Sequence, residues 1–411
     1  MESIDHTSEA RLGPSFVLYL IWTFVVVARP QDHLSFLLPL RPVLVISIIT
    51  LIAMFFERPG QQRSIFSSTE VKLVCVLYLI MLAGVPMAAH RGVAFEFVLV
   101  GVPSVLLYFA ATVLQVNSIR RLNALMAVLA LSLLFAAAFY AADALGQRGV
   151  RVSAGLAYDP NDIAMVLTTF IPIGLYIFFG PFGFKMKAVS VAGILLAAAG
   201  IMLSGSRGGV LALATVVTVF LLSRAPHIRT AARVGIVAVL ALVFINYFAV
   251  VEGRFENFGE DYNFKDETGR LHIWKQNLAI IAQNPILGTG AGCSTISLGL
   301  HRAEVGGTQA WQTSHSSVFQ YAVDNGIPGF IIYVILNIIA IANVRRIRRD
   351  RGHPLANAAF FVELSFYGFW AGALLLSHAY SVNLFLLLGI SAALRFLYER
   401  KDLGTQPETI N

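Results

Sequence analysis

Long runs of apolar residues alternate along this chain with short polar segments. Runs such as 124–140 and 193–203 lack the apolar–polar alternation of the strands in a membrane β-barrel. In lipid, an open chain must satisfy its backbone groups internally, which a helix does, and a helix crosses the bilayer with roughly 20 apolar residues. The pattern therefore predicts an all-α polytopic membrane protein.

We expect about twelve spanning helices. They cover residues 15–28, 39–56, 71–88, 93–113, 123–142, 163–180, 188–203, 208–223, 234–250, 327–344, 357–377 and 380–395. This divides the chain into a nine-helix membrane region over 1–250, a large polar loop over 251–326, and a three-helix membrane region with a polar tail over 327–411.

The positions of lysine and arginine predict the orientation of these helices. Most of them fall into the segments that face the cytoplasm if both termini lie there, and five arginines follow one span within 345–351. Basic residues are enriched in the short cytoplasmic loops of membrane proteins. The large loop over 251–326 is then exterior, in the periplasm of a Gram-negative bacterium, as is a shorter loop over 145–162.

The large loop is predicted to be folded. Leu271, Trp274, Leu278 and Ile281 recur at helical spacing within 270–283, and Pro285 ends this segment. We expect a short amphipathic helix that lies as a lid on the membrane surface.

Composition supports the membrane assignment and changes the interpretation of charge. Hydrophobic residues make up 57% of the chain and charged residues only 13%, which is too few for a soluble protein of this length. The formal charge of +7 would suggest a nucleic-acid partner in a soluble protein. Here the cytoplasmic basic residues account for it, so we expect the lipid bilayer as a partner and no nucleic acid.

Two arginines are candidates for anion binding. Arg207, in Ser204-Gly-Ser-Arg-Gly-Gly209, lies between two apolar runs, where a charge is costly and is often functional. The alternative is an arginine that reaches toward lipid phosphates, although the glycines favour close backbone approach. Arg270 begins the amphipathic segment. It faces either solvent or a lipid headgroup.

His315 is the candidate base, since a histidine side chain accepts protons near neutral pH. Its alternative is a solvated or structural histidine. Asp324 either orients a base or caps the next helix. The glycines of 284–292 suggest an anion-binding turn, but only weakly. Asp159 and Asp162 suit a turn before a helix. No metal-ligand spacing and no cofactor motif are present in the sequence, so we expect neither metal nor cofactor.

Two exterior arginines and a histidine suit the transfer of a sugar from a polyprenyl diphosphate. The planar guanidinium groups would stabilise the departing diphosphate. The imidazole would deprotonate the attacking hydroxyl.

At these positions the sequence resembles the O-antigen ligase and polymerase family of bacterial membrane glycosyltransferases. The resemblance covers a core over 150–345. Besides the stretch around Arg207, it rests on three others: Arg151-Val-Ser-Ala-Gly with Asp159-Pro-Asn161; Gly269-Arg-Leu-His-Ile-Trp274 with Asn284-Pro-Ile-Leu-Gly-Thr-Gly290; and His315 with Asp324-Asn-Gly-Ile-Pro-Gly329. It departs from the pattern at Ser316, where many relatives have asparagine, and at Asp324, where many have glutamate.

The resemblance implies a donor glycan on undecaprenyl diphosphate and no metal or nucleotide. The acceptor would be lipid A-core, a protein or a growing glycan, and the location would be the bacterial inner membrane. Arg207, Arg270 and His315 would be catalytic. Arg207 and Arg270, together with Arg151 and Asp324, would bind substrate. Ligase and polymerase versions have the same catalytic needs, so both remain open. A transporter or flippase is the alternative, but it would typically show repeats and mid-membrane charges.

Overall fold

The computed structural model describes residues 12–57, 65–146, 159–223, 269–306 and 311–400. Every regular element within these residues is a helix, which confirms the all-α prediction. In chain order the elements are α1 (Pro14–Ala28), α2 (Pro30–His33), η2 (Ser35–Leu40), α3 (Pro42–Phe56), η3 (Ile65–Ser67), α4 (Thr69–Gly84), η4 (Val85–Met87), α5 (Arg91–Glu96), η5 (Phe97–Gly101), α6 (Val102–Gln115), α7 (Ile119–Gly146), α8 (Pro160–Phe179), α9 (Phe184–Leu203), α10 (Arg207–Leu222), α12 (Arg270–Gln283), α13 (Ser294–Glu304), α14 (Ser317–Arg349), α15 (Ala356–Ala373) and α16 (Val382–Glu399).

The protein is a multi-pass membrane protein. Among the described residues, eight helical segments are long and apolar enough to cross a membrane, and α1 and α10 are shorter apolar helices. The expected spans fall on these helices or on α15, except 234–250, which lies outside the described residues. The total of twelve spans and the division at residues 250 and 326 stay predictions.

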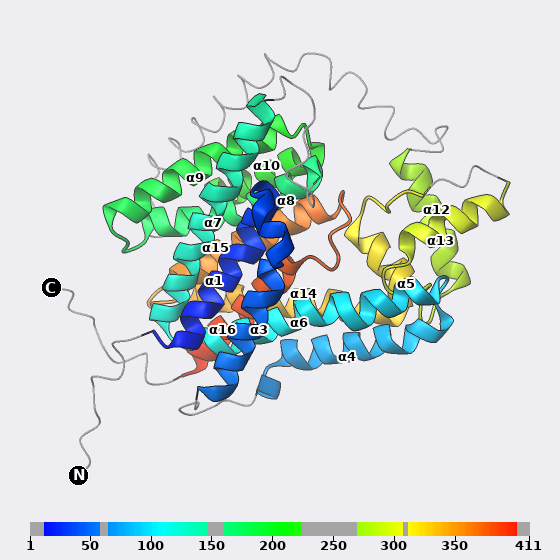
Figure 1. Ribbon diagram of the computed structural model, residues 1–411, viewed down its shortest axis with the longest axis horizontal. Helices are drawn as coiled ribbons and strands as arrows, with labels where there is room; N and C mark the ends of the chain where they lie inside the picture. The colour runs from blue at the N-terminus through cyan, green and yellow to red at the C-terminus, as the bar shows by residue number, and fades with distance from the viewer. Residues whose placement is uncertain (1–11, 58–64, 147–158, 224–268, 307–310, 401–411) are drawn as a thin grey trace, which may run out of the picture.

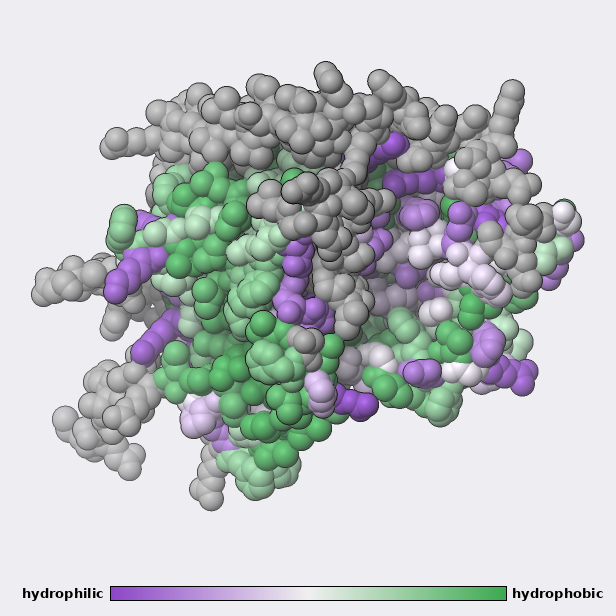
Figure 2. All heavy atoms as spheres, turned by 45° about the horizontal axis from the view of Figure 1, so that its top comes forward, coloured by the Kyte–Doolittle hydropathy of each residue, from purple (hydrophilic) through white to green (hydrophobic). Residues whose placement is uncertain are grey.

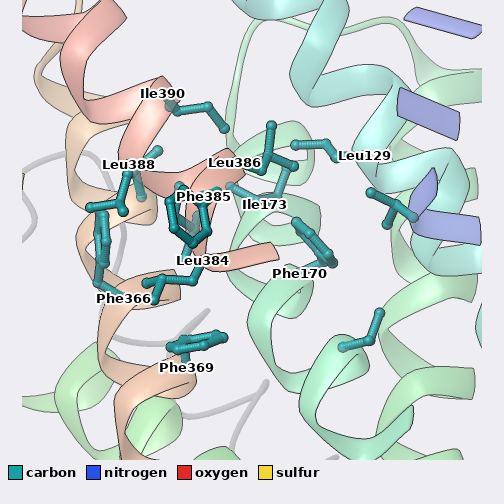
Figure 3. Close-up of a cluster of buried hydrophobic side chains, with 14 of the residues drawn as sticks. Leu129, Phe170, Ile173, Phe366, Phe369, Leu384, Phe385, Leu386, Leu388 and Ile390 are labelled. Atoms are coloured by element: carbon teal, nitrogen blue, oxygen red, sulfur yellow. The ribbon is translucent and has the colours of Figure 1, made fainter. Parts of the chain in front are cut away.

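Helix α8 lies at the centre of the bundle. Its most apolar stretch is 83% buried inside the protein, whereas that of α3 is only 6% buried. Helices α7, α9, α10 and α15 pack around α8 (Figure 1). Figure 3 shows leucine, isoleucine and phenylalanine side chains of α7, α8, α15 and α16 filling the space between them. The space around α8 is therefore mainly apolar, although buried polar side chains such as Tyr19 and Thr112 bond to one another elsewhere in the bundle.

Local sequence determines where α8 begins. Pro160 occupies the first turn, where a proline costs no hydrogen bond. The Asp159 side chain accepts from the backbone N–H groups of Asn161 (2.6 Å) and Asp162 (2.8 Å), and the Asp162 side chain accepts from Asp159 N (3.2 Å). This reciprocal cap confirms that the two aspartates serve a turn before a helix.

Helices α12 and α13 form a lobe beside the bundle, close to α5 and the beginning of α14 (Figure 1). Figure 2 shows apolar side chains over much of the bundle and hydrophilic side chains gathered toward this lobe. The predicted amphipathic helix is confirmed, because α12 covers Arg270–Gln283 and ends before Pro285.

The predicted apolar face of α12 is partly right, because Trp274 and Ile281 pack against a buried cluster, but the centre of the buried face lies elsewhere. Ile273 and Ile280 are buried, with Asn277 between them, while Leu278 is 57% exposed. The reason is tertiary packing, since Ile273 and Ile280 belong to a cluster with Leu298 of α13 and Val323 of α14. A spacing of seven places these two isoleucines on one helical face as well as any stripe does.

Helix α14 is broken at Gly326, whose φ is +69°. A Cβ there would lie 2.5 Å from the Ile286 carbonyl oxygen, so the segment before residue 290 crosses directly over the break. Thr289 N donates to Val323 O (2.8 Å) and Ile327 N donates to Pro285 O (2.8 Å). These bonds use backbone groups that the break leaves without helical partners.

The two ends of α15 differ in chemistry. Near its beginning, the buried Glu363 accepts from Arg345 (3.0 Å) and Arg348 (2.6 Å) of α14. Beyond its end, residues 374–381 connect it to α16. The arginine-rich segment and this connection therefore lie at opposite ends of the bundle. Which end is cytoplasmic stays a prediction.

Candidate functional site

The connection over residues 374–381 is the place where the segments that carry the predicted site residues meet. The Leu375 carbonyl accepts a hydrogen bond from Arg270 Nη1 (3.3 Å). The next carbonyl, of Leu376, accepts from Ser317 Oγ (2.7 Å). These two adjacent carbonyl groups therefore bind the first residues of both α12 and α14. Those residues, Arg270 and Ser317, are 47 positions apart in the sequence.

Arg207 begins α10 and reaches the same connection through its glycine neighbours. A Cβ on Gly208 would lie 3.3 Å from Leu376 Cγ, and one on Gly209 would lie 2.5 Å from Ala164 Cβ of α8. The Ser206 side chain caps the helix by accepting from Gly209 N (3.2 Å). The first turn of α10 is thus held between α8 and the connection, with the half-buried Arg207 at its beginning.

Arg270 begins α12 directly after the buried Gly269. One turn later, Trp274 Nε1 donates to the Ser314 carbonyl (3.1 Å). The Trp274 ring also stacks on Phe319 of α14, with centroids 5.6 Å apart. Helix α12 therefore contacts the connection through Arg270 and holds the residue before His315 through Trp274.

His315 has a backbone conformation that is rare for a residue with a side chain. Its φ is +47°, in the left-handed region. Its neighbours Ser314 and Ser316 are buried, whereas the His315 side chain is only partly covered, with Nδ1 3.4 Å from Thr313 Oγ1. Such strain persists where surrounding contacts hold it in place, and it is common at functional sites. Here Trp274 holds Ser314 before the histidine, and the bond from Ser317 to Leu376 holds the chain after it.

Asp324 is fully buried and contacts groups of the protein itself. Its Oδ1 accepts from Ser294 N, the first residue of α13, at 2.7 Å, and its Oδ2 accepts from Tyr380 OH at 3.0 Å. The backbone N–H groups of Gly292 and Cys293 also donate hydrogen bonds to this carboxyl group. The glycine turn that the sequence suggested as an anion site thus surrounds an internal carboxyl group. A role for Asp324 in substrate binding stays a prediction.

Burial raises the pKa of Tyr380 well above its usual value, and the neighbouring Asp324 adds to this. The phenol is therefore protonated at neutral pH and donates to the carboxyl group. Asn325 Nδ2 donates in turn to Tyr380 OH (2.7 Å). Through Tyr380, the connection is bound to the first half of α14 as well as to its first turn.

The structure brings the segments of Arg207, Arg270 and His315 together and leaves Arg151 untested, because Arg151 lies outside the described residues. Sequence reasoning missed the connection over 374–381 and its His378. The available signal was a polar interruption, Ser377-His-Ala-Tyr-Ser381, between two expected spans. Within the described ranges, no three histidine, cysteine, aspartate or glutamate side chains are grouped as a metal site.

Part of the chain is similar to a known family. A family model described as O-antigen ligase matches residues 192–334. The matched range contains Arg207, Arg270, His315 and Asp324 but neither Arg151 nor the connection over 374–381. No match is found among the curated proteins. The resemblance predicted from the sequence is confirmed.

Proposed function

We propose that this protein transfers a glycan from undecaprenyl diphosphate to an acceptor hydroxyl, because residues 192–334 match the O-antigen ligase family. The proposed site lies at the end of the bundle that carries the 374–381 connection. One observation carries the proposal: the segments bearing Arg207, Arg270 and His315 all contact Leu375, Leu376 or residues bonded to them.

The roles follow from the chemistry of the side chains. His315 accepts the proton of the acceptor hydroxyl, whose oxygen attacks the anomeric carbon of the donor sugar. The bond from that carbon to the diphosphate breaks, and the diphosphate leaves with the lipid. Arg207 and Arg270 stabilise the negative charge that develops on it, because a guanidinium binds two phosphate oxygens at once. No proton has to be supplied to the diphosphate.

The location of the site suits a lipid-linked donor. Helices α10 and α14 are apolar along most of their length, while their first turns carry or follow the polar residues of the site. A diphosphate on a polyprenyl chain would lie at this level, with its tail among apolar helices. We assign this end to the periplasmic face of the bacterial inner membrane and the arginine-rich end of α14 to the cytoplasm. Lipid A-core, a protein or a growing glycan would serve as the acceptor.

The test uses the purified full-length protein in lipid nanodiscs with an undecaprenyl-diphosphate glycan and an acceptor. We expect His315→Ala to lower the transfer rate by about 10²–10⁴-fold, as for loss of a general base. Arg207→Ala and Arg270→Ala should each cost about 10²–10³-fold, as for loss of one group that stabilises developing charge. Arg207→Lys should restore little, because an ammonium lacks the planar fork.

Arg349→Ala is the matched control, since Arg349 is an exposed arginine at the opposite end of α14. It should transfer at the wild-type rate. Wild-type rates for the variants at positions 207, 270 and 315, with normal membrane insertion, would refute the proposal. Movement of the intact lipid-linked glycan across the bilayer without transfer would instead support a flippase.

A further inference from the structure

We propose that His378 and Asp162 form a positioning pair that sets where Arg207 lies. The inference rests on the proposed function, because it concerns how the site binds the diphosphate of the donor. Neither residue lies within the matched range of 192–334.

Asp162 is fixed before it meets His378. Its Oδ2 accepts from Asp159 N in the reciprocal cap of α8, so the carboxylate is held at the first turn of that helix. The other oxygen, Oδ1, lies 3.1 Å from His378 Nε2. The Asp162 side chain is 34% exposed.

His378 is fixed from the opposite side. Its backbone N donates to Ser317 Oγ (2.8 Å), and the same hydroxyl donates to the Leu376 carbonyl. The imidazole is 12% exposed, and its Nε2 is not aligned for a linear hydrogen bond to Asp162. The contact is therefore a close approach of two polar side chains. It connects the first turn of α8 to the connection between α15 and α16.

The first turn of α10 lies between these two elements. Gly209 packs against Ala164, two residues after Asp162, and Gly208 packs against Leu376, two residues before His378. The contact at Gly209 is too close for a side chain, and the contact at Gly208 is tight. A change in the separation of α8 and the connection would therefore shift this turn, and Arg207 begins it.

This arrangement explains why a histidine and an aspartate lie beside a site that already contains His315. A shift of about 1 Å in a binding group is enough to weaken catalysis strongly. In this role His378 acts through Arg207 and does not touch the reacting atoms. Its loss should weaken both donor binding and the stabilisation of the departing diphosphate, so kcat/KM should fall.

The experiment measures transfer by the purified full-length protein in nanodiscs over a range of donor concentrations. We expect His378→Ala to lower kcat/KM for the lipid-linked donor by about 10-fold, which is less than the loss in Arg207→Ala. His378→Gln keeps a polar side chain that can reach Asp162 and should recover most of the loss. The double variant of His378→Ala with Asp162→Ala should be no worse than the worse single variant, because the two act as one unit.

The control is His353→Ala, in the connection at the opposite end of α15, where the ring packs on Tyr398 at 4.8 Å. It should leave kcat/KM unchanged. Unchanged kinetics for His378→Ala would overturn the proposal, as would a loss larger than that of Arg207→Ala.

A second measurement separates this inference from the proposed function. Hydrogen exchange at the amides of residues 208–211 should rise in His378→Ala and stay unchanged in His353→Ala. It can be measured whether or not the protein is a transferase. Unchanged exchange would overturn the positioning role even if Arg207→Ala abolishes transfer. Raised exchange in a protein without transferase activity would refute only the proposed function.

Discussion

Replacing Asp324 should loosen the first turn of α13, because its buried carboxyl group holds donors from two other parts of the chain. Asp324→Ala removes the acceptor of Ser294 N (2.7 Å) and of Tyr380 OH (3.0 Å). A buried donor left without a partner costs ~1–3 kcal/mol. The two donors together therefore lower the local stability by about 2–6 kcal/mol. Asp324→Asn keeps one carbonyl oxygen and should cost about half as much.

Hydrogen exchange followed by mass spectrometry measures this effect locally. If the turn opens by local unfolding, a loss of 2–6 kcal/mol raises amide exchange at residues 294–297 by roughly 30-fold to 10⁴-fold. Glu363→Gln is the matched control. Glu363 is a second buried carboxyl group, but it contacts Arg345 and Arg348 at the other end of the bundle. It should leave exchange at 294–297 unchanged.

The reasoning fails if Asp324→Ala leaves exchange at residues 294–297 unchanged. That result would mean that the glycine turn keeps its conformation without the carboxyl group. A rise at 294–297 in Glu363→Gln as well would show general loosening instead of a local effect. In either case Asp324 would not be the residue that holds α13 against α14 and Tyr380.

Three further outcomes are expected. Ser317→Ala should lower stability by about 1–3 kcal/mol and raise the donor KM, because one hydroxyl joins two backbone groups of the connection; thermal unfolding and transfer kinetics test this. Gly288→Ala should fail to fold, since φ is +67° and the new Cβ would lie 2.4 Å from a carbonyl oxygen; the yield of monodisperse protein tests this. In a Cys75→Ser background, an impermeant thiol reagent should label Val305→Cys from the periplasm and Arg349→Cys only after permeabilisation; the reverse would refute the orientation.

Much of the fold could be predicted from the sequence because lipid imposes a simple rule. Long apolar runs must be helices in the bilayer, and their boundaries coincide with local signals. Pro160 with the two aspartates fixes the beginning of α8, and Pro285 follows the end of α12. These signals act within one helical turn, so they can be recognised without knowledge of the tertiary structure.

The face of α12 could not be predicted in this way. The predicted face has the same regular helical spacing as the buried one; its residues are Leu271, Trp274, Leu278 and Ile281. Which face is used depends on α13 and α14, and the polar Asn277 within the buried one conceals it further. Helical periodicity gives the spacing of a face but not its partner.

The site shows the same limit. Arg207, Arg270 and His315 were singled out because their residue types suit phosphate binding and proton transfer. The residues that hold them act mostly through backbone carbonyls, of Leu375, Leu376 and Ser314. A carbonyl has no sequence signature, since every residue has one. That these segments meet at the connection over 374–381 could therefore be recognised only once the helices were assembled, although its polar residues marked it as unusual.

Glycine explains why α10 lies so close to α8 and to the connection over 374–381. Gly209 allows α10 to approach Ala164 at a distance that a side chain would prevent, and Gly208 packs tightly against Leu376. The arginine that begins this helix is therefore fixed by backbone packing from two sides rather than by its own contacts alone. A guanidinium that binds a diphosphate must keep its orientation when the substrate arrives. In this protein, the turn that begins with Arg207 packs closely against α8 and the connection because the residues after it are small.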